Sequence, residues 1–226
     1  MEKVRILWSG ITGRTGVLAE KFAKDYDFVE IVAGLSRTNE NYYSYDQLDD
    51  IKEEFDIIVD FSNAANIDIL LDFAKKTNKP LIIGTAGLTQ EQVDKIEETA
   101  KVVPIFRGGN FRFHCKKFID DIVEFAKTTD QDLELVETHY KTKKIPSETA
   151  KEIARRVLEE TGKTVKITSK LEYDELINDW RLGSFHFRVD SFAQLAKDVL
   201  KIAFMFKDKK AGFVWDLNKL LDEKYN

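Results

Sequence analysis

The segment ETHYKTKKIPSETA, residues 137–150, gathers side chains that can move a proton and bind an anion. It contains His139, one of three histidines in 226 residues, followed within five residues by three lysines, in a chain of formal net charge -5. An imidazole exchanges a proton near neutral pH, and lysine ammonium groups attract carboxylates. The segment therefore indicates a site where a small anion undergoes proton transfer. The alternative is a solvated lysine run beside an ordinary helix cap.

Pro146 and Ser147 introduce a predicted helix that runs from about Glu148 to Glu160 and ends at Gly162. The first backbone N–H groups of such a helix lack intrahelical acceptors and favour negative charge. Together with the lysines and the hydroxyl groups at its start, they form a candidate carboxylate-binding site.

A glycine-rich turn, SGITGRTG, offers a second kind of site. Gly10, Gly13 and Gly16 lie where a predicted strand (Val4–Ser9) meets a predicted helix (Arg14–Lys24). Glycines in that position allow a tight turn and a close approach of a pyrophosphate to the helix N-terminus. The spacing is GxxGxxG rather than GxGxxG, and a purely structural turn is the alternative.

The end of the second predicted strand, GLSRTN, bears on cofactor choice. Ser36 and Arg37 stand where a carboxylate would bind the ribose 2′-hydroxyl of NADH. An arginine there suits a 2′-phosphate, so NADPH is the expected cofactor, with NADH as a second one. A solvated loop arginine is the alternative.

Two more loops, Asp60–Ala65 and Gly84–Thr89, follow predicted strands and carry small and hydroxyl side chains. Ligands of parallel sheets collect at the carboxyl ends of the strands. The loops leave room for a flat ring and hydrogen bonds to a carboxamide, although ordinary capping would use the same residues.

The elements that must position these residues alternate along the first half of the chain. Continuous apolar runs separated by helical patterns of 10–15 residues are typical of a parallel sheet covered on both faces. The fold class is therefore α/β, with a Rossmann-like dinucleotide-binding domain. The predicted strands are 4–9, 28–36, 55–62, 80–85 and 101–106, and the predicted helices are 14–24, 64–77 and 89–100.

After about residue 110 the regular alternation stops, which predicts a second, α+β domain. A predicted helix (116–127) precedes the strand DLELVETHY; further strands are KTVKITSKLEY and GSFHFRV, and Phe192–Phe206 forms a helix.

Composition excludes several classes of protein. A net charge of -5 disfavours nucleic-acid binding, and no apolar run reaches the ~18 residues of a membrane span. A single cysteine and no evident targeting peptide at the N-terminus predict a cytoplasmic protein. His114 beside Cys115 is too little for a metal site, so no metal is expected.

In combination, these motifs resemble the dihydrodipicolinate reductases, the NAD(P)H enzymes of bacterial diaminopimelate and lysine synthesis. The similarity extends over almost the whole chain and into its last segment, FAQLAKDVLKIAFMFKDKKAGFVWDLNKLL. The matching motifs are Gly13–Gly16, Val59–Ser62, Gly84–Gly87, Asn110–Phe111 and Glu137–Ala150.

The resemblance implies a role for each matching position. His139 and Lys143 correspond to the proton-transfer pair, and Tyr140, Ser147, Glu148 and Thr149 occupy the substrate-binding positions. The substrate is a small dicarboxylate, and the family forms tetramers, with a dimer as the alternative. The implied domains are 1–110 with 209–226 for the dinucleotide and 111–208 for the substrate. The implied cofactor-binding residues are Gly10, Thr12, Gly13, Arg14, Thr15, Gly16, Ser36, Arg37, Phe61, Ser62, Gly84, Thr85, Ala86, Asn110 and Phe111.

The chain departs from the family pattern at two substrate-binding positions. Tyr140 replaces a second histidine, and Glu148 replaces a glycine where a substrate carboxylate approaches. These departures leave two other hypotheses: a related NAD(P)-dependent dehydrogenase acting on another imine or amino-acid-derived substrate, and a non-catalytic dinucleotide-binding protein.

Overall fold

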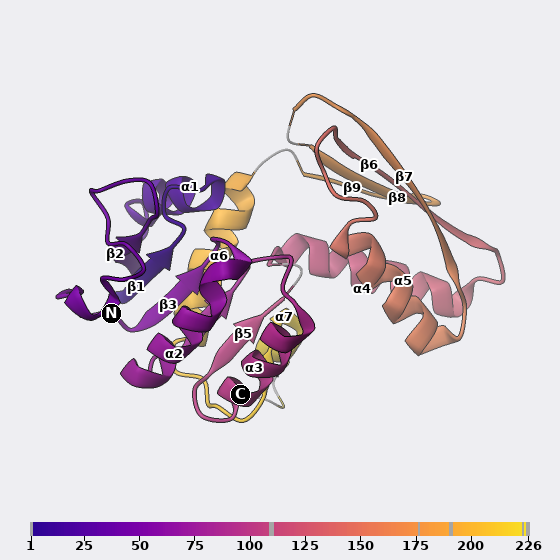
Figure 1. Cartoon of the computed structure of the whole chain (residues 1–226). Helices are drawn as coiled ribbons and strands as arrows, with labels where there is room; N and C mark the ends of the chain where they lie inside the picture. The colour runs from indigo at the N-terminus through magenta and orange to yellow at the C-terminus, as the bar shows by residue number, and fades with distance from the viewer. Residues whose placement is uncertain (1, 109–110, 176, 190–191, 223, 225–226) are drawn as a thin grey trace. The chain divides into compact units, whose positions relative to one another are not determined.

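The computed structural model describes residues 2–108, 111–175, 177–189, 192–222 and 224. The chain divides into two compact units (Figure 1). Unit 1 comprises Met1–Phe111 and Phe192–Asn226, and unit 2 comprises Arg112–Ser191.

Unit 1 is built on a six-stranded sheet in which every pairing is parallel. Its strand order is β10-β5-β4-β3-β1-β2. From β1 the chain first adds β2 on one side and then β3, β4 and β5 on the other, so the order of strand addition switches at β1. Ligands of such sheets bind at this switch point, outside the carboxyl ends of the strands. The predicted Rossmann-like domain is thereby confirmed. The strands are β1 (Val4–Ser9), β2 (Val29–Leu35), β3 (Ile57–Asp60), β4 (Leu81–Ile83), β5 (Ile105–Arg107) and β10 (Val214–Trp215).

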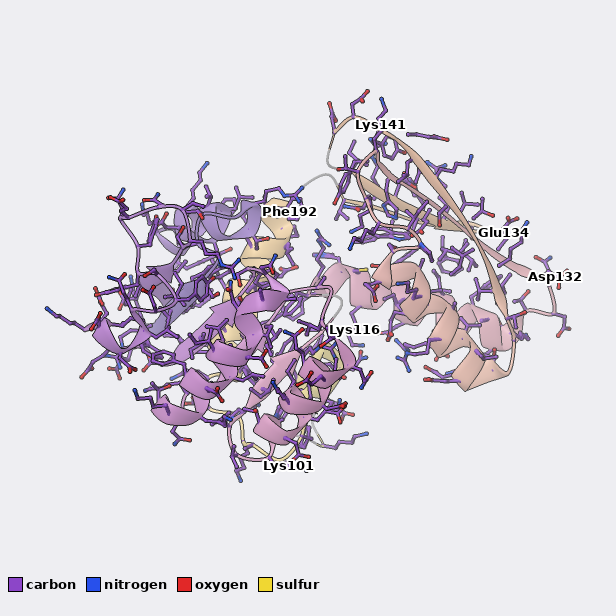
Figure 2. The ribbon with its side chains drawn as sticks, in the orientation of Figure 1. Lys101, Lys116, Asp132, Glu134, Lys141 and Phe192 are labelled. Carbon is purple, nitrogen blue, oxygen red and sulfur yellow. The ribbon has the colours of Figure 1, made fainter. Side chains whose placement is uncertain are left out.

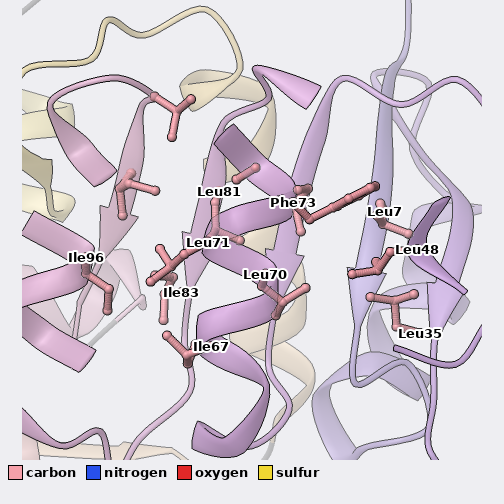
Figure 3. Close-up of a cluster of buried hydrophobic side chains, with 14 of the residues drawn as sticks. Leu7, Leu35, Leu48, Ile67, Leu70, Leu71, Phe73, Leu81, Ile83 and Ile96 are labelled. Atoms are coloured by element: carbon pink, nitrogen blue, oxygen red, sulfur yellow. The ribbon is translucent and has the colours of Figure 1, made fainter. Parts of the chain in front are cut away.

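Apolar side chains of the helices and the sheet form the core of unit 1. Figure 3 shows Leu70 and Leu71 of α2 beside Leu81 and Ile83 of β4, all almost fully buried. α3 begins with a capping box between Thr89 and Gln92, as a Thr-x-x-Gln sequence predicts. The helices of this unit are α1 (Arg14–Ala23), α2 (Ile67–Thr77), α3 (Gln90–Ala100), α6 (Phe192–Phe206) and α7 (Leu217–Leu221), with short 3-10 turns η1 (Leu48–Asp50) and η2 (Ala64–Asn66).

Helix α6 has the predicted bounds but belongs to unit 1, which corrects the expected domain range of 111–208. It packs against α1, and its Phe204 ring lies 5.2 Å from the ring of Phe28. Periodicity predicts the helix and its apolar face, but it does not indicate which core that face covers.

Unit 2 consists of two helices and a mixed four-stranded sheet of order β7-β6-β8-β9. β6 and β7 are parallel and are connected through α5, whereas β8 and β9 pair antiparallel. Gly162 ends α5 at φ 73°, a left-handed conformation that favours glycine. This unit is the predicted α+β domain. Its elements are α4 (Phe113–Thr128), β6 (Leu133–Tyr140), α5 (Glu148–Thr161), β7 (Val165–Tyr173), β8 (Asn178–Leu182) and β9 (Phe185–Val189).

Candidate active site

The β1–α1 turn of unit 1 is held tightly by backbone contacts. Gly10 has φ 79°, and a Cβ atom there would lie 2.5 Å from the carbonyl oxygen of Phe61. A Cβ atom on Gly16 would lie 2.4 Å from the carbonyl oxygen of Ile11. Gly13 is the N-cap of α1, so the first N–H groups of that helix lie at the carboxyl end of β1. This geometry suits a pyrophosphate, as the glycine spacing predicts.

Around that turn, Thr12 and Arg14 are exposed and Thr15 is buried. The Arg14 guanidinium lies 4.9 Å from the centre of the Phe192 ring, within the same unit. The Thr12 hydroxyl lies 3.2 Å from that of Ser36, so β1–α1 and the end of β2 meet at this point.

Arg37 follows Ser36 at the carboxyl end of β2 and is exposed. Its Nη2 donates a hydrogen bond to Oδ1 of Asn66, and its guanidinium lies 5.8 Å from the centre of the Tyr45 ring. Within the described part of the chain, Arg37 enters no ion pair. A positive charge therefore remains available where a ribose 2′-phosphate is expected.

The loops after β3 and β4 are joined to each other. The backbone N–H of Ser62 donates to the Thr85 hydroxyl at 3.0 Å. The Phe61 ring covers Gly84, where a Cβ atom would lie only 2.3 Å from it. Ala86 is exposed at the end of this loop. The two loops are thus joined to each other, and the Phe61 carbonyl also lies against Gly10 of the glycine turn.

Phe111 is buried, with its ring 5.2 Å from that of Phe61. Asn110, also predicted to bind the cofactor, lies outside the described residues.

Asp60 is a polar residue of this region to which motif analysis assigned no role. It is fully buried at the end of β3, and its Oδ1 accepts hydrogen bonds from Ser9 at 2.8 Å and Ser62 at 2.6 Å. Burial raises the pKa of Asp60 despite these bonds. The sequence signal for this residue was a single acidic side chain at the end of the apolar run Ile57–Val59.

In unit 2, alternate residues of β6 face the interior, and the last two of these are Glu137 and His139. Figure 2 labels Glu134 and Lys141 near the two ends of this strand. Both Glu137 and His139 are fully buried, and His139 Nε2 lies 2.9 Å from Glu137 Oε2. The His139 ring meets Trp180 edge-on at 5.2 Å. Its Nδ1 has no hydrogen-bond partner among the described residues.

Glu137 is the centre of this buried network. It accepts hydrogen bonds from the backbone N–H of Ser147 at 3.0 Å, the Ser147 hydroxyl at 2.5 Å and the Ser169 hydroxyl at 2.6 Å. Burial by itself would raise the pKa of Glu137, but hydrogen bonds from His139, Ser147 and Ser169 outweigh it and lower the pKa to about 2. The side chain is therefore a carboxylate at neutral pH, and His139 carries its proton on Nε2.

Ser147 caps α5, since its hydroxyl accepts from the backbone N–H of Ala150 at 3.2 Å. Trp180 Nε1 donates to the same hydroxyl at 3.1 Å. Ser147 thus uses its side chain inside unit 2, which the motif by itself did not predict. Thr149 is buried in the first turn.

Glu148 points away from this network. Its side chain is 64% exposed and forms an ion pair with Lys151 at 2.7 Å, within the first turn of α5. A carboxylate in this first turn is stabilised by the helix dipole, and its charge is paired with Lys151.

Lys143 lies in the turn after β6 and is half-buried. Its backbone N–H donates to the carbonyl of Tyr140 at 3.0 Å, and its ammonium lies 5.9 Å from the centre of the Tyr140 ring. The turn therefore brings together the lysine and the tyrosine that the motif singled out.

The remaining predicted features are negative ones. Among the described residues, no three metal-ligating side chains gather, and His114 stands exposed beside a buried Cys115. No helix in the described ranges is long and apolar enough to span a membrane.

Comparison with known proteins gives consistent matches. Residues 4–111 match the family model described as dihydrodipicolinate reductase, N-terminus. The 4-hydroxy-tetrahydrodipicolinate reductase of Caldanaerobacter subterraneus subsp. tengcongensis is 36% identical over 155 residues, which are 67% of this chain and 62% of that protein. The enzyme of that name from Zymomonas mobilis is 29% identical over 240 residues, covering 93% of this chain and 94% of its own.

Among solved structures, the dipicolinate-bound dihydrodipicolinate reductase from Paenisporosarcina sp. TG-14 has a similar fold. The TM-score is 0.73 at 17% identity, over 97% of this chain and 100% of that one. This likeness concerns the fold, including the sheet of unit 2.

Proposed function

Because the chain belongs to the dihydrodipicolinate reductase family, we propose that it reduces 4-hydroxy-tetrahydrodipicolinate (dihydrodipicolinate) to tetrahydrodipicolinate in diaminopimelate and lysine synthesis. The observation that carries the proposal is that one chain contains both kinds of site: a dinucleotide-type turn in unit 1, and a histidine, a lysine and a helix N-terminus in unit 2.

The family uses NAD(P)H, and the finer assignment to NADPH rests on Arg37. Its guanidinium is exposed, oriented and not neutralised by a carboxylate among the described residues. When bound, the nicotinamide would supply a hydride to C4 of the conjugated cyclic imine that 4-hydroxy-tetrahydrodipicolinate forms by losing its 4-hydroxyl group as water. Gly10, Gly13 and Gly16 would admit the pyrophosphate, and the loops after β3 and β4 would border the nicotinamide.

Unit 2 would bind the substrate and move its proton. The first N–H groups of α5, the Thr149 hydroxyl and the Lys143 ammonium attract a carboxylate. After hydride addition the resulting enamine needs a proton, and we assign that step to Lys143 and His139. Since Glu137 occupies Nε2, the proton that His139 takes up or releases is the one on Nδ1.

Burial of His139 makes Lys143 the member of the pair that contacts substrate. The imidazole is fully buried, whereas the lysine is half-buried in the following turn. Ser147, which serves Glu137 and the cap of α5, would support this site through the helix start.

One observation favours a second candidate, a related dehydrogenase acting on another cyclic imine. Tyr140 stands where the family has a second histidine, and its phenol carries no positive charge toward a dicarboxylate. The non-catalytic hypothesis is disfavoured because the relatives that the chain matches are named as reductases.

We also propose a homo-oligomer and a cytoplasmic location. The sheet of unit 2 is the element by which the family is expected to assemble, as a tetramer or a dimer. The sequence contains a single cysteine, Cys115, which excludes a disulfide within the chain, and this together with dependence on a reduced nicotinamide suits a reducing compartment.

The decisive experiment supplies the purified protein with substrate made in place by a dihydrodipicolinate synthase and follows the loss of NADPH absorbance. We expect oxidation that requires the synthase product and is faster with NADPH than with NADH. Turnover of an unrelated cyclic imine but not of this product would favour the second candidate. Tight NADPH binding without any turnover would contradict both.

A further inference from the structure

In unit 1, two chains of contacts connect the buried Asp60 carboxylate with the guanidinium of Arg37. One arm runs from Asp60 through Ser62 to Asn66, and the other runs from Asp60 through Ser9 to Tyr45. The Ser62 hydroxyl donates to Asp60 Oδ1 at 2.6 Å and accepts from Asn66 Nδ2 at 3.0 Å. On the other arm, the Ser9 hydroxyl donates to the same carboxylate oxygen at 2.8 Å and lies 2.9 Å from the Tyr45 hydroxyl.

Both arms end on the guanidinium of Arg37. Asn66 Oδ1 accepts a hydrogen bond from Nη2, and the Tyr45 ring lies 5.8 Å below the guanidinium carbon. Strands β1, β2 and β3 are neighbours in the sheet, so these contacts connect the exposed Arg37 side chain to the buried Asp60 carboxylate.

The direction of the hydrogen bonds determines how the Asn66 amide is oriented. Since the Ser62 hydroxyl gives its proton to Asp60, it can only accept from Asn66, and the amide must present its NH₂ group there. The amide oxygen then faces Arg37, which has donors only. Asn66 is 3% exposed, so it has little freedom to rotate out of this position.

The choice of an amide at this position also preserves charge. A carboxylate would satisfy the same guanidinium donor but would neutralise it and repel an incoming phosphate. Asparagine orients the guanidinium and leaves its full positive charge. Arg37 makes no ion pair in the part of the chain that the structure describes.

We propose that Asn66 is a positioning residue for cofactor specificity: through the Asp60–Ser62 arm, it holds Arg37 as an uncompensated cation for a phosphomonoester on the adenosine ribose. The Tyr45 ring lies under the guanidinium and supports it there. The inference rests on the proposed use of NADPH, and it assigns the discrimination between NADPH and NADH to a residue 29 positions away from Arg37.

The test measures binding of NADPH and NADH by calorimetry, without substrate, in the full-length protein and its Asn66→Ala, Asn66→Asp and Arg37→Ala variants. Asn63→Ala is the matched control, because Asn63 lies in the same loop but its side chain only accepts from the Ala65 N–H. Adenosine 2′,5′-bisphosphate and AMP serve as a second pair of ligands that lack the nicotinamide. Thermal unfolding establishes that each variant is folded.

We expect Arg37→Ala and Asn66→Asp each to weaken NADPH binding by roughly 10–100-fold, the range of a lost charge-assisted contact, with little change for NADH. Asn66→Ala should lose a smaller part, about 3–10-fold, since the charge stays but its orientation is freed. Asn63→Ala should retain the NADPH preference. The bisphosphate and AMP should follow NADPH and NADH, respectively.

Several results would overturn the inference. One is that the ratio of NADPH affinity to NADH affinity stays unchanged in both Asn66 variants while Arg37→Ala lowers it. Another is that the Asn66 variants lose affinity for NADPH and NADH equally. If Asn66→Asp does not fold, Asn66→Ala decides by the same ratio. An unchanged ratio in Arg37→Ala would instead contradict the assignment of NADPH itself, and failure of wild-type protein to bind either nucleotide would contradict the proposed function.

Discussion

Replacing Glu137 by glutamine should remove a buried carboxylate that four donors stabilise: the His139 ring, the Ser147 hydroxyl and N–H, and the Ser169 hydroxyl. A glutamine has one acceptor oxygen, and its NH₂ group faces donors instead of acceptors. The lowering of the Glu137 pKa from its ordinary value of about 4.5 to about 2 corresponds to about 3 kcal/mol of stability at neutral pH. We expect Glu137→Gln to lower the free energy of unfolding of unit 2 by about that amount.

The loss should depend on pH in a defined direction. Because the folded pKa is depressed, the contribution of Glu137 is fully present above about pH 4.5 and disappears as the pH falls toward 2. At pH 3 less than half of this contribution remains, so the difference between wild type and variant should shrink by about 2 kcal/mol between pH 7 and pH 3.

Urea unfolding followed by the fluorescence of Trp180 measures this difference, since the indole donates to Ser147 within the network. Replacing Trp8 and Trp215 by phenylalanine in all variants removes the other tryptophan signals. Glu134→Gln is the control: it lies on the same strand, and its ion pair with Lys166 is screened by solvent and should contribute much less than the buried network of Glu137. A loss of equal size at both pH values, or one no larger than in the control, would refute the reasoning.

Three other predictions concern activity and nucleotide binding. Lys143→Met and His139→Gln should each lower turnover at saturating NADPH by on the order of 100-fold. Fluorescence titration should show unchanged NADPH affinity in both, and normal turnover in both would sink the assignment of the proton step. Arg37→Ala should raise KM for NADPH far more than KM for NADH in steady-state assays; an equal rise would remove the argument for phosphate recognition. Gly16→Ala places a Cβ 2.4 Å from the Ile11 carbonyl oxygen, so it should destabilise unit 1 by roughly 1–3 kcal/mol in urea unfolding and weaken the binding of both NADPH and NADH. Wild-type stability and binding in this variant would contradict the prediction and show that the turn can relax.

Much of unit 1 could be predicted because its strands are continuous apolar runs bounded by turns. Strand β1 and helix α6 have the predicted bounds, whereas β5 is shorter than predicted: it begins at Ile105, and Val102 in the preceding turn is 61% exposed. Strand β8 had no distinct signal, because NDWRL contains only two apolar residues and is buried partly through polar contacts. Short polar strands are recognised only through their partners.

The candidate site was predicted in its residue types but not in its connections. The glycine turn, Ser36–Arg37 and the histidine–lysine segment all follow from local patterns. The role of Ser147 does not, because its hydroxyl bonds to Glu137, which lies ten positions earlier on a neighbouring element. Asn66 gave no local signal either, since its partner Arg37 lies 29 positions earlier in the chain, after strand β2.

The sequence by itself determined the succession of strands and helices, the backbone geometry of the glycine turn and the kinds of groups available for catalysis, because each depends on neighbours within a few positions. Only the tertiary structure decided that α6 completes unit 1, that Glu137 stabilises a buried histidine and a helix cap, and that Asn66 rather than a carboxylate faces Arg37. Those features depend on hydrogen-bond direction and burial between distant segments, which residue spacing does not encode.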